Sequence, residues 1–273
     1  MASVRQEVRW TTLDGEGPRS PPCVVTPFED VLLRDAAFDT RSLPLRDPEY
    51  FVSGQVHNQL NEWEKVLSSF EGSVLPLDDI RSWLSNGVDV THYFKPFKGK
   101  FKKKVYDSST PPAAYFPNSP SCLNHAAFVA SELEKMIGTG AITVLGKVGE
   151  CQMPRVVMPL TVEPSKLRLC HDNRYVNLWV RDCPFQLETL KDLHWLVAKD
   201  SLMVSCDDKS GYNHVTLSKE SRTFFGIVFS GYVMVYNTLP FGLKLAPYVY
   251  QTLGMVPTTY LRSCQKSPEP FLA

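Results

Sequence analysis

Two amphipathic segments open the patterned part of the chain. Over residues 51–70, apolar side chains recur at intervals of three or four, which places them on one face of a helix. These residues are Val56, Leu60, Trp63, Val66 and Leu67. Residues 77–86 predict a second, shorter helix, with Asp78 and Asp79 in its first turn and Gly87 directly after its last residue.

Beyond residue 120, helix and strand patterns alternate. Residues 124–137 predict a helix that is capped by Asn124 and ended by a glycine. Extended segments are predicted at residues 141–146, 155–162 and 166–172, followed by a helix over 187–199 and an apolar strand over 201–207. Residues 224–242 predict a hairpin with its turn at Ser230-Gly231. This alternation predicts a mixed α/β or α+β domain.

The remaining segments are rich in turn-forming residues. Residues 1–50 have no sustained period and few apolar side chains, so we expect a mobile leader. Residues 107–121 are rich in Pro and Ser and predict an extended linker. The predicted organisation is a leader at 1–50, a helical and basic region with this linker at 51–120, a main domain at 121–262 and an irregular tail at 263–273.

Composition excludes several classes of protein. The chain has 273 residues, 43% of them hydrophobic, which suffices for one large domain or two modest ones. No run approaches the roughly 18–20 apolar residues that cross a bilayer, and the N-terminus has no signal-peptide pattern. The seven cysteines are scattered and never spaced Cys-x-x-Cys. We therefore expect an intracellular protein, in the cytoplasm or nucleus, with reduced thiols and without a disulfide frame or a zinc site.

Positive charge gathers in one stretch although the chain as a whole is neutral. The 29 Lys and Arg residues balance 29 Asp and Glu, so no global field marks a nucleic-acid binder. Within residues 95–104, phenylalanines alternate with lysines, and such a pattern can hold a nucleic-acid strand by stacking and phosphate attraction. The alternative is a solvated lysine edge whose phenylalanines turn inward. The candidate nucleic-acid-binding residues are Lys95, Lys98, Lys100, Lys102, Lys103 and Lys104.

Two polar clusters carry candidate chemistry. In VSCDDKSGYNHV, an apolar strand ends in Asp207 and Asp208 before a turn of small residues. A carboxylate at such a strand end, beside free backbone amides, can hold Mg²⁺ against a triphosphate, although a strand that ends in Asp before a turn is also common. In KLRLCHDNRYVNLWV, Arg168 and Arg174 flank Asp172, which suits either phosphate recognition or a structural ion-pair network.

A third cluster completes a set that resembles a known family. In TLPFGLKLAPYVYQ, a Pro and a Gly predict a turn into an apolar helix. Together and in this order, the clusters resemble the reverse transcriptase domain of retroelements. KLRLCHDNRYVN is similar to the fingers motif R-x-x-x-D-x-R-x-x-N, and LMVSCDDKSGYNHV to the first palm motif, a strand followed by D-x-K-S-G-Y. LPFGLKLAPYVYQ is similar to LPFGL-x-x-AP-x-x-F-Q, and ELEKMIGTGAI to a fingers segment further upstream.

The resemblance extends over residues 120–262. Within the family, the sequence is similar to DIRS-like and related retrotransposons that encode a tyrosine recombinase. It implies an α+β fold, with the fingers and a partial palm of a right-hand polymerase. It also implies an RNA or DNA template-primer, deoxynucleotides and Mg²⁺ as partners. Asp207 matches the catalytic, metal-binding aspartate of the family motif, and Asp208 matches the variable position that follows.

The resemblance also implies a nucleotide-binding surface. Arg168 would contact the incoming phosphates, and the backbone at Ser210 and Gly211 would face the triphosphate. The ring of Tyr212 would exclude a ribose 2′-hydroxyl and so favour deoxynucleotides. The residues expected beside the nascent base pair are Phe241 and Gly242.

One departure from the family pattern limits the expected activity. Reverse transcriptases carry a second acidic pair in a Tyr-x-Asp-Asp hairpin after the LPFGL motif, whereas residues 258–273 contain no Asp. Two-metal phosphoryl transfer needs two ions held about 3.5–4 Å apart by bridging carboxylates. We therefore expect a reverse transcriptase-like fragment that does not polymerise by itself. The alternatives are a noncatalytic nucleic-acid-binding module and a pseudogene product that folds poorly.

Overall fold

The computed structural model describes residues 5–6, 23–24, 53–73, 75–185, 199–200 and 208–264. Several predictions fall outside these residues, namely most of the leader at 1–50, nearly all of the helix at 187–199, the strand at 201–207 with Asp207, and most of the tail at 263–273. Within the leader, the structure describes a short antiparallel pair, β1 (Arg5–Gln6) with β2 (Cys23–Val24).

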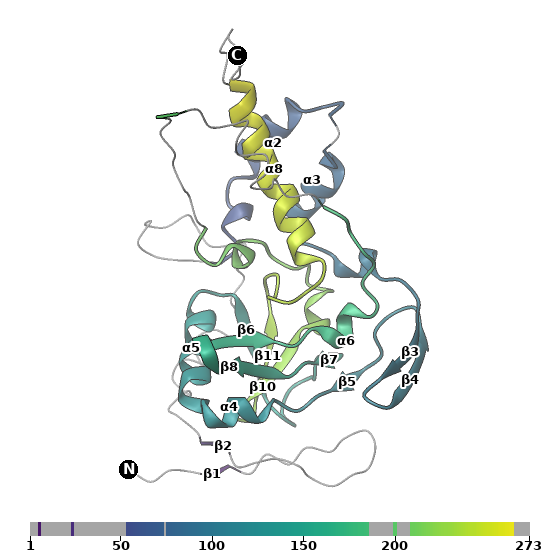
Figure 1. Cartoon of the computed structure of the whole chain (residues 1–273), viewed down its shortest axis with the longest axis vertical. Helices are drawn as coiled ribbons and strands as arrows, with labels where there is room; N and C mark the ends of the chain where they lie inside the picture. Colours follow the sequence, from purple (N-terminus) through teal and green to yellow (C-terminus); the bar gives the residue numbers. More distant parts are fainter. Residues whose placement is uncertain are drawn as a thin grey trace.

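A five-stranded sheet forms the centre of the α+β fold, which confirms the predicted class (Figure 1). The strands are β5 (Ala114–Tyr115), β7 (Val156–Val157), β10 (Gly226–Phe229), β11 (Tyr232–Tyr236) and β6 (Ile142–Lys147), in this spatial order. The β5–β7 and β7–β10 pairs are parallel, and β10–β11 and β11–β6 are antiparallel. The predicted hairpin over 224–242 is confirmed. Its turn residues Ser230 and Gly231 have φ of 50° and 82°, the positive values that tight hairpin turns require.

Successive side chains of a strand point to opposite faces of a sheet, and side chains of β11 pack on both faces. On one face, Tyr232, Met234 and Tyr236 of β11 join the main hydrophobic core. On the other face, Val233 packs with Val157 of β7 in a smaller cluster. The β10–β11 hairpin is buried along its whole length, so its position is fixed by packing on two sides.

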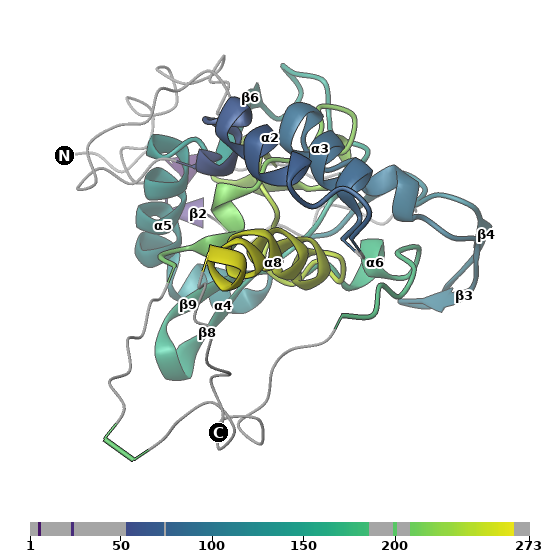
Figure 2. The same cartoon turned by 90° about the horizontal axis from the view of Figure 1, so that it is seen from above.

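The helical part of the N-terminal region packs at one end of the molecule. It consists of α2 (Leu60–Ser68) and α3 (Leu77–Asn86), and α2 contacts both α3 and the long helix α8 (Ala246–Cys264) (Figure 2). The helix predicted over 77–86 is confirmed. The helix predicted over 51–70 is wrong in its first half, because the chain turns through Gly54, whose φ is 72°, and becomes α-helical only at Leu60.

His57 ties this region to the rest of the fold. Its ring is buried, and Nε2 accepts a hydrogen bond of 2.8 Å from the Thr216 backbone N–H. Nδ1 therefore carries the proton and donates it to the Leu84 carbonyl at 2.8 Å. The bond between His57 and Thr216 crosses the predicted boundary between 51–120 and 121–262, so these two regions pack against each other.

The segment predicted as a linker, residues 107–121, runs along the edge of the sheet. Ala114 and Tyr115 form the edge strand β5, where prolines are tolerated because one side of the strand needs no backbone donors. Ser119 then caps α4 (Pro120–Asn124) by accepting the backbone N–H of Ser121. The segment adds a strand to the sheet, and its last two residues, predicted as extended, are instead the first two of α4.

The helix predicted over 124–137 is divided in two. Asn124 ends α4, and α5 (Ala126–Gly138) begins after His125, whose φ of −124° and ψ of 33° are not helical. The prediction that Asn124 caps this helix is therefore wrong, since His125 occupies the cap position and its side chain makes no capping bond. The remaining elements are β3 (Phe97–Phe101), β4 (Lys104–Ser108), β8 (Leu160–Glu163), β9 (Arg168–His171) and α6 (Arg174–Asn177). Across the ranges given above, no helix combines the length and the apolar character needed to cross a bilayer.

Candidate nucleotide-binding site

Residues predicted from three separate motifs meet on one surface, called here the motif surface: Arg168, Tyr212 and Phe241. The guanidinium carbon of Arg168 lies 5.9 Å from the ring centroid of Phe241. The Phe241 and Tyr212 ring centroids are 6.2 Å apart, with 37° between the ring planes. Phe241 is 57% exposed, so a ligand can reach its ring from solvent.

Each residue of the motif surface lies at or near the start of a structural element. Arg168 is the first residue of β9, which pairs antiparallel with β8. Tyr212 lies in the 3₁₀ turn η5 (Gly211–His214), and Phe241 lies in the turn that leads to α8. Three different segments therefore supply the surface, and its geometry depends on how they are held together.

Two asparagines of the segment around α6 hold the Phe241 turn. The side-chain amide of Asn173 donates to the Phe241 carbonyl at 3.0 Å, and that of Asn177 donates to the Gly242 carbonyl at 2.9 Å. The Asn177 side-chain oxygen also accepts the backbone N–H of Lys244 at 2.9 Å. The last Asn of the fingers motif is thus bonded to the LPFGL motif, which links two of the sequence clusters directly.

Gly242 allows this turn to lie close to β9. Its φ is 89°, and a Cβ atom there would lie 3.2 Å from the backbone oxygen of His171. Glycine meets both requirements, because it alone adopts such angles without a steric penalty. The predicted base-pair residue Gly242 is therefore needed for the shape of the turn, whatever it contacts in a complex.

Beneath this turn, His171 is a buried structural residue. Its ring stacks on Tyr236 of β11 with centroids 4.8 Å apart and 14° between the planes. Burial lowers the pKa of His171 to about 3, although the Asp172 carboxylate opposes part of the shift. The ring is therefore neutral near pH 7 and packs as an aromatic side chain.

The two arginines of the fingers motif have different surroundings. Arg174 makes a two-pronged ion pair with Asp172, with nitrogen–oxygen distances of 2.9 and 2.7 Å, and this contact lowers the pKa of Asp172. Among the residues placed by the structure, no carboxylate pairs with Arg168, whose guanidinium contacts the Phe241 ring. The structural ion-pair interpretation therefore applies to Arg174, and Arg168 is the arginine available for a phosphate.

Helix α8 packs against the turn that follows the predicted catalytic strand. The Tyr250 hydroxyl donates a hydrogen bond to the Asp208 carboxylate, and the Tyr250 ring meets the Tyr212 ring edge-on at 5.4 Å and 84°. Ser210 has a φ of 54°, and a Cβ atom on Gly211 would lie 2.6 Å from Cζ of Tyr250. Ser210 and Gly211 thus form a tight turn with an aromatic ring packed against its backbone.

The predicted magnesium ligand cannot be placed, because Asp207 lies outside the described residues. Its neighbour Asp208 is exposed and bonded to Tyr250. Within the part of the chain that was searched, no group of three or more His, Cys, Asp or Glu side chains could hold a metal. Asp207 as a catalytic, metal-binding residue stays a prediction.

The basic stretch at 95–104 extends into the β3–β4 hairpin, called here the basic hairpin, which lies at one edge of the molecule (Figures 1 and 2). Its phenylalanines turn inward. Phe97 packs on Trp179 at 5.1 Å, and Phe101 packs on Phe116 and Tyr175 at 5.8 and 5.5 Å between ring centroids. These rings are half-buried against the protein, as in the inward alternative, and the lysines face solvent.

The lysines of the basic hairpin differ in their partners. Lys98 pairs with Asp107 at 3.1 Å, and just before the hairpin Lys95 lies 3.6 Å from Asp182. Lys102, at the turn with a φ of 44°, lies over the Phe116 ring at 4.7 Å. The others are Lys100, Lys103 and Lys104, all exposed and, within the described ranges, without a carboxylate partner.

The comparisons with known proteins find structural likenesses but no match by sequence. No protein-family profile matches the sequence, and no curated protein matches it. Among solved structures, the native protease–reverse transcriptase of prototype foamy virus is similar, with a TM-score of 0.43 and 13% sequence identity. The likeness covers 84% of this chain and 29% of the viral chain, so this chain spans less than a third of that protein.

Proposed function

We propose that this chain is a reverse transcriptase-like domain whose motif surface binds a deoxynucleoside triphosphate. The proposal is carried by the contacts that join Arg168, Phe241 and Tyr212, because the sequence assigns these residues to nucleotide binding from three separate motifs. The fingers and partial palm of a right-hand polymerase, and a position within a DIRS-like retroelement, belong to the same proposal and rest on the motif resemblance.

The motif surface offers one chemical group for each part of a nucleotide. A guanidinium without a carboxylate partner suits a phosphate, since its donors match phosphate oxygens in pairs. The exposed Phe241 ring offers a nucleobase a face for stacking. Tyr212 packs against Phe241 and Tyr250, and in the proposal its ring is the group that meets the sugar.

Magnesium and the template-primer belong to the proposal on the motif resemblance alone. Asp207 is the proposed metal ligand, and the ion would offset the negative charge of the triphosphate when it is bound. Arg168 supplies part of the same charge compensation from the protein side. Binding and orientation of the nucleotide are therefore the functions proposed for the described residues.

Titration calorimetry with dTTP, in the presence and absence of Mg²⁺, tests this proposal on the full chain. We expect Arg168→Gln to weaken dTTP binding by about 10- to 100-fold, the effect of losing hydrogen bonds to a charged group. The matched control is Arg174→Gln on the same segment, which removes an equal charge already paired with Asp172 and should change dTTP affinity by less than about threefold. A wild-type chain that binds no dTTP, or equal losses in both variants, would contradict the proposal.

A second candidate function is nucleic-acid binding by the basic hairpin. Its lysines line an exposed edge, while its phenylalanines pack on Trp179 and Tyr175 and fix the hairpin to the core. Because the phenylalanine rings pack on the protein and the lysines face solvent, we propose contacts to the phosphate backbone without sequence preference. This function is compatible with the first and does not depend on it.

Salt dependence distinguishes this candidate from nonspecific adhesion. We expect Lys100→Gln with Lys103→Gln to weaken binding of a labelled RNA–DNA duplex and to lower the slope of log affinity against log salt by about 2. The control variant replaces Lys65 and Lys135, exposed lysines of α2 and α5 that pair with Glu62 and Glu132. If both double variants shift the slope equally, the basic hairpin is not the binding surface.

A further inference from the structure

Tyr250 occupies a position that this chain fills differently from the motif it resembles. LPFGL-x-x-AP-x-x-F-Q has Phe where LPFGLKLAPYVYQ has Tyr250. The added hydroxyl is used, since it donates to the carboxylate of Asp208. Asp208 itself stands at the variable position of D-x-K-S-G-Y, so the motif pattern specifies neither member of this bond.

The Tyr250 ring contacts the turn at two further places. It packs on the backbone of Gly211, where a Cβ atom would come within 2.6 Å of Cζ and 3.1 Å of Cε2. It also meets the ring of Tyr212 edge-on, with centroids 5.4 Å apart. The turn is therefore held from one side by a ring and at its start by a hydrogen bond, although Asp208 and Tyr250 are 42 positions apart.

Helix α8, which carries Tyr250, is packed into the main core. Val249 and Leu253, next to Tyr250 along the helix, are buried in the main core, and Val249 is fully buried. The turn is exposed from Asp208 to Ser210, and its later part is hydrogen-bonded to Gly54 through Asn213. On the side of α8, Tyr250 contacts the turn through its hydroxyl and its ring.

We propose that Tyr250 is a positioning residue that holds Tyr212 in the orientation needed to distinguish a deoxyribose from a ribose. This inference rests on the proposed function, because Tyr212 has a sugar to distinguish only if the motif surface binds nucleotides. The hydroxyl of Tyr250 acts through Asp208 on the start of the turn, and its ring acts directly on Tyr212. In the described structure the guanidinium of Arg168 contacts Phe241 and has no polar contact with Tyr250 or Asp208. Changes at Tyr250 or Asp208 should therefore alter sugar selectivity more than triphosphate affinity.

Four variants of the full chain separate the bond from the ring. Tyr250→Phe keeps the ring and removes the donor, and Asp208→Ala removes the acceptor. Asp208→Asn keeps an acceptor oxygen and is the rescue variant. Tyr248→Phe is the control, because it makes the same change on the same helix at a ring that packs on Trp83 and Tyr93 instead of the turn.

Amide exchange and nucleotide affinity are measured on each variant. Without nucleotide, we expect amide exchange in residues 208–214 to become about fivefold faster in Tyr250→Phe and Asp208→Ala, the effect of one lost hydrogen bond. The ratio of UTP to dUTP dissociation constants should fall by about the same factor, since these ligands differ only at the 2′ position. Asp208→Asn and Tyr248→Phe should stay within about twofold of wild type in both measurements.

The two arms fail in different ways. Unchanged exchange in Tyr250→Phe, or faster exchange with an unchanged UTP to dUTP ratio, overturns the positioning role while the proposed function stands. A wild-type chain that binds neither nucleotide overturns the proposed function and the selectivity role with it. In that case the exchange arm still decides whether Tyr250 holds the turn.

Discussion

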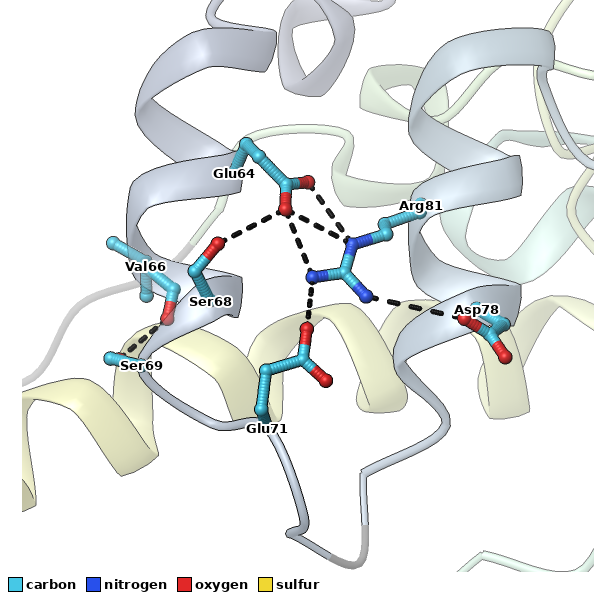
Figure 3. A network of polar contacts seen from close by, with 7 residues as sticks. All are labelled: Glu64, Val66, Ser68, Ser69, Glu71, Asp78 and Arg81. Carbon is cyan, nitrogen blue, oxygen red and sulfur yellow. Dashed lines mark hydrogen bonds and ion pairs between the residues drawn. The ribbon is translucent and has the colours of Figure 1, made fainter.

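The exposed α2–α3 pair and the buried contacts between segments use polar groups in opposite ways. At the surface, Arg81 of α3 joins Glu64 of α2 at 2.9 Å and Glu71 at 2.6 Å (Figure 3). In the interior, the neutral rings of His57 and His171 lie buried between segments. Exposed ion pairs are solvated and screened, whereas a buried polar group that loses its partner keeps its full desolvation cost. The interior contacts should therefore decide stability, and the surface network should add little.

The largest expected loss of stability comes from His57→Ala. This change leaves the Thr216 N–H and the Leu84 carbonyl without their buried partner and opens a cavity between the helical region and the sheet region. We expect the free energy of unfolding to fall by about 3 kcal/mol. Urea denaturation measures this, with His92→Ala, an exposed histidine, as the control. A loss no larger than that of the control would show that His57 does not join the two regions.

The next effect is a dependence of stability on pH that is specific to His171. Its pKa is lowered to about 3 in the fold and is about 6.5 in an unfolded chain, so the unfolded state binds the proton first as pH falls. We expect unfolding free energy to decrease by about 2 kcal/mol between pH 6.5 and 4.5 from this group. The lowered pKa of Asp172 adds a loss of the same sign at lower pH.

Denaturation of wild type and His171→Phe across this pH range isolates the contribution. The Phe ring can still stack on Tyr236, so the variant should fold and lose most of the slope. Parallel slopes for the two proteins would mean that the His171 ring is protonated in the fold, which would contradict its burial as a neutral group.

A smaller loss of stability is expected from a substitution at Gly242, in the turn that contains Phe241. Gly242→Ala places a side chain at a φ of 89° and a Cβ atom 3.2 Å from the His171 backbone oxygen, which should cost about 1–2 kcal/mol. Gly254→Ala is the control, because its Cβ atom would meet nothing within 4 Å on the exposed side of α8, and alanine favours a helix. Thermal melts should shift in opposite directions. Equal shifts would show that the turn does not need glycine.

The smallest effect is expected for Arg81→Met. The guanidinium bonds Glu64 and Glu71, which are 52% and 61% exposed, so water replaces most of what is lost. We expect a change in the unfolding midpoint that is close to experimental error and vanishes in 1 M salt, where exposed charges are screened. A loss comparable to that of His57→Ala would reverse the contrast between surface and interior.

Local signals were enough to predict several elements. The acidic first turn and Gly87 mark α3, and Ser230-Gly231 marks the β10–β11 turn, because caps and turns depend on a few adjacent residues. The failure at Asn124 is also local, since a capping residue in the sequence can equally end the preceding short helix.

The contacts that build the site lie far apart in sequence. Asn173 meets Phe241 across 68 positions, and His57 meets Thr216 across 159. Neither contact leaves a periodic or adjacent pattern. The charge cluster singled out Arg168 with Arg174, but only the motif resemblance assigned Phe241 a role beside the nucleotide. The motif Asn177 was a visible signal, but its role in holding the LPFGL turn depends on tertiary packing.

Photolabelling with an azido-substituted dATP tests the central claim, that the motif surface holds a nucleotide, most directly. We predict that the label appears in the tryptic peptides Thr223–Lys244 and Ser210–Lys219, which contain Phe241 and Tyr212. Unlabelled dATP should compete for it, and Arg168→Gln should reduce it. Labelling confined to residues 95–104, or labelling that dATP does not displace, would contradict the account.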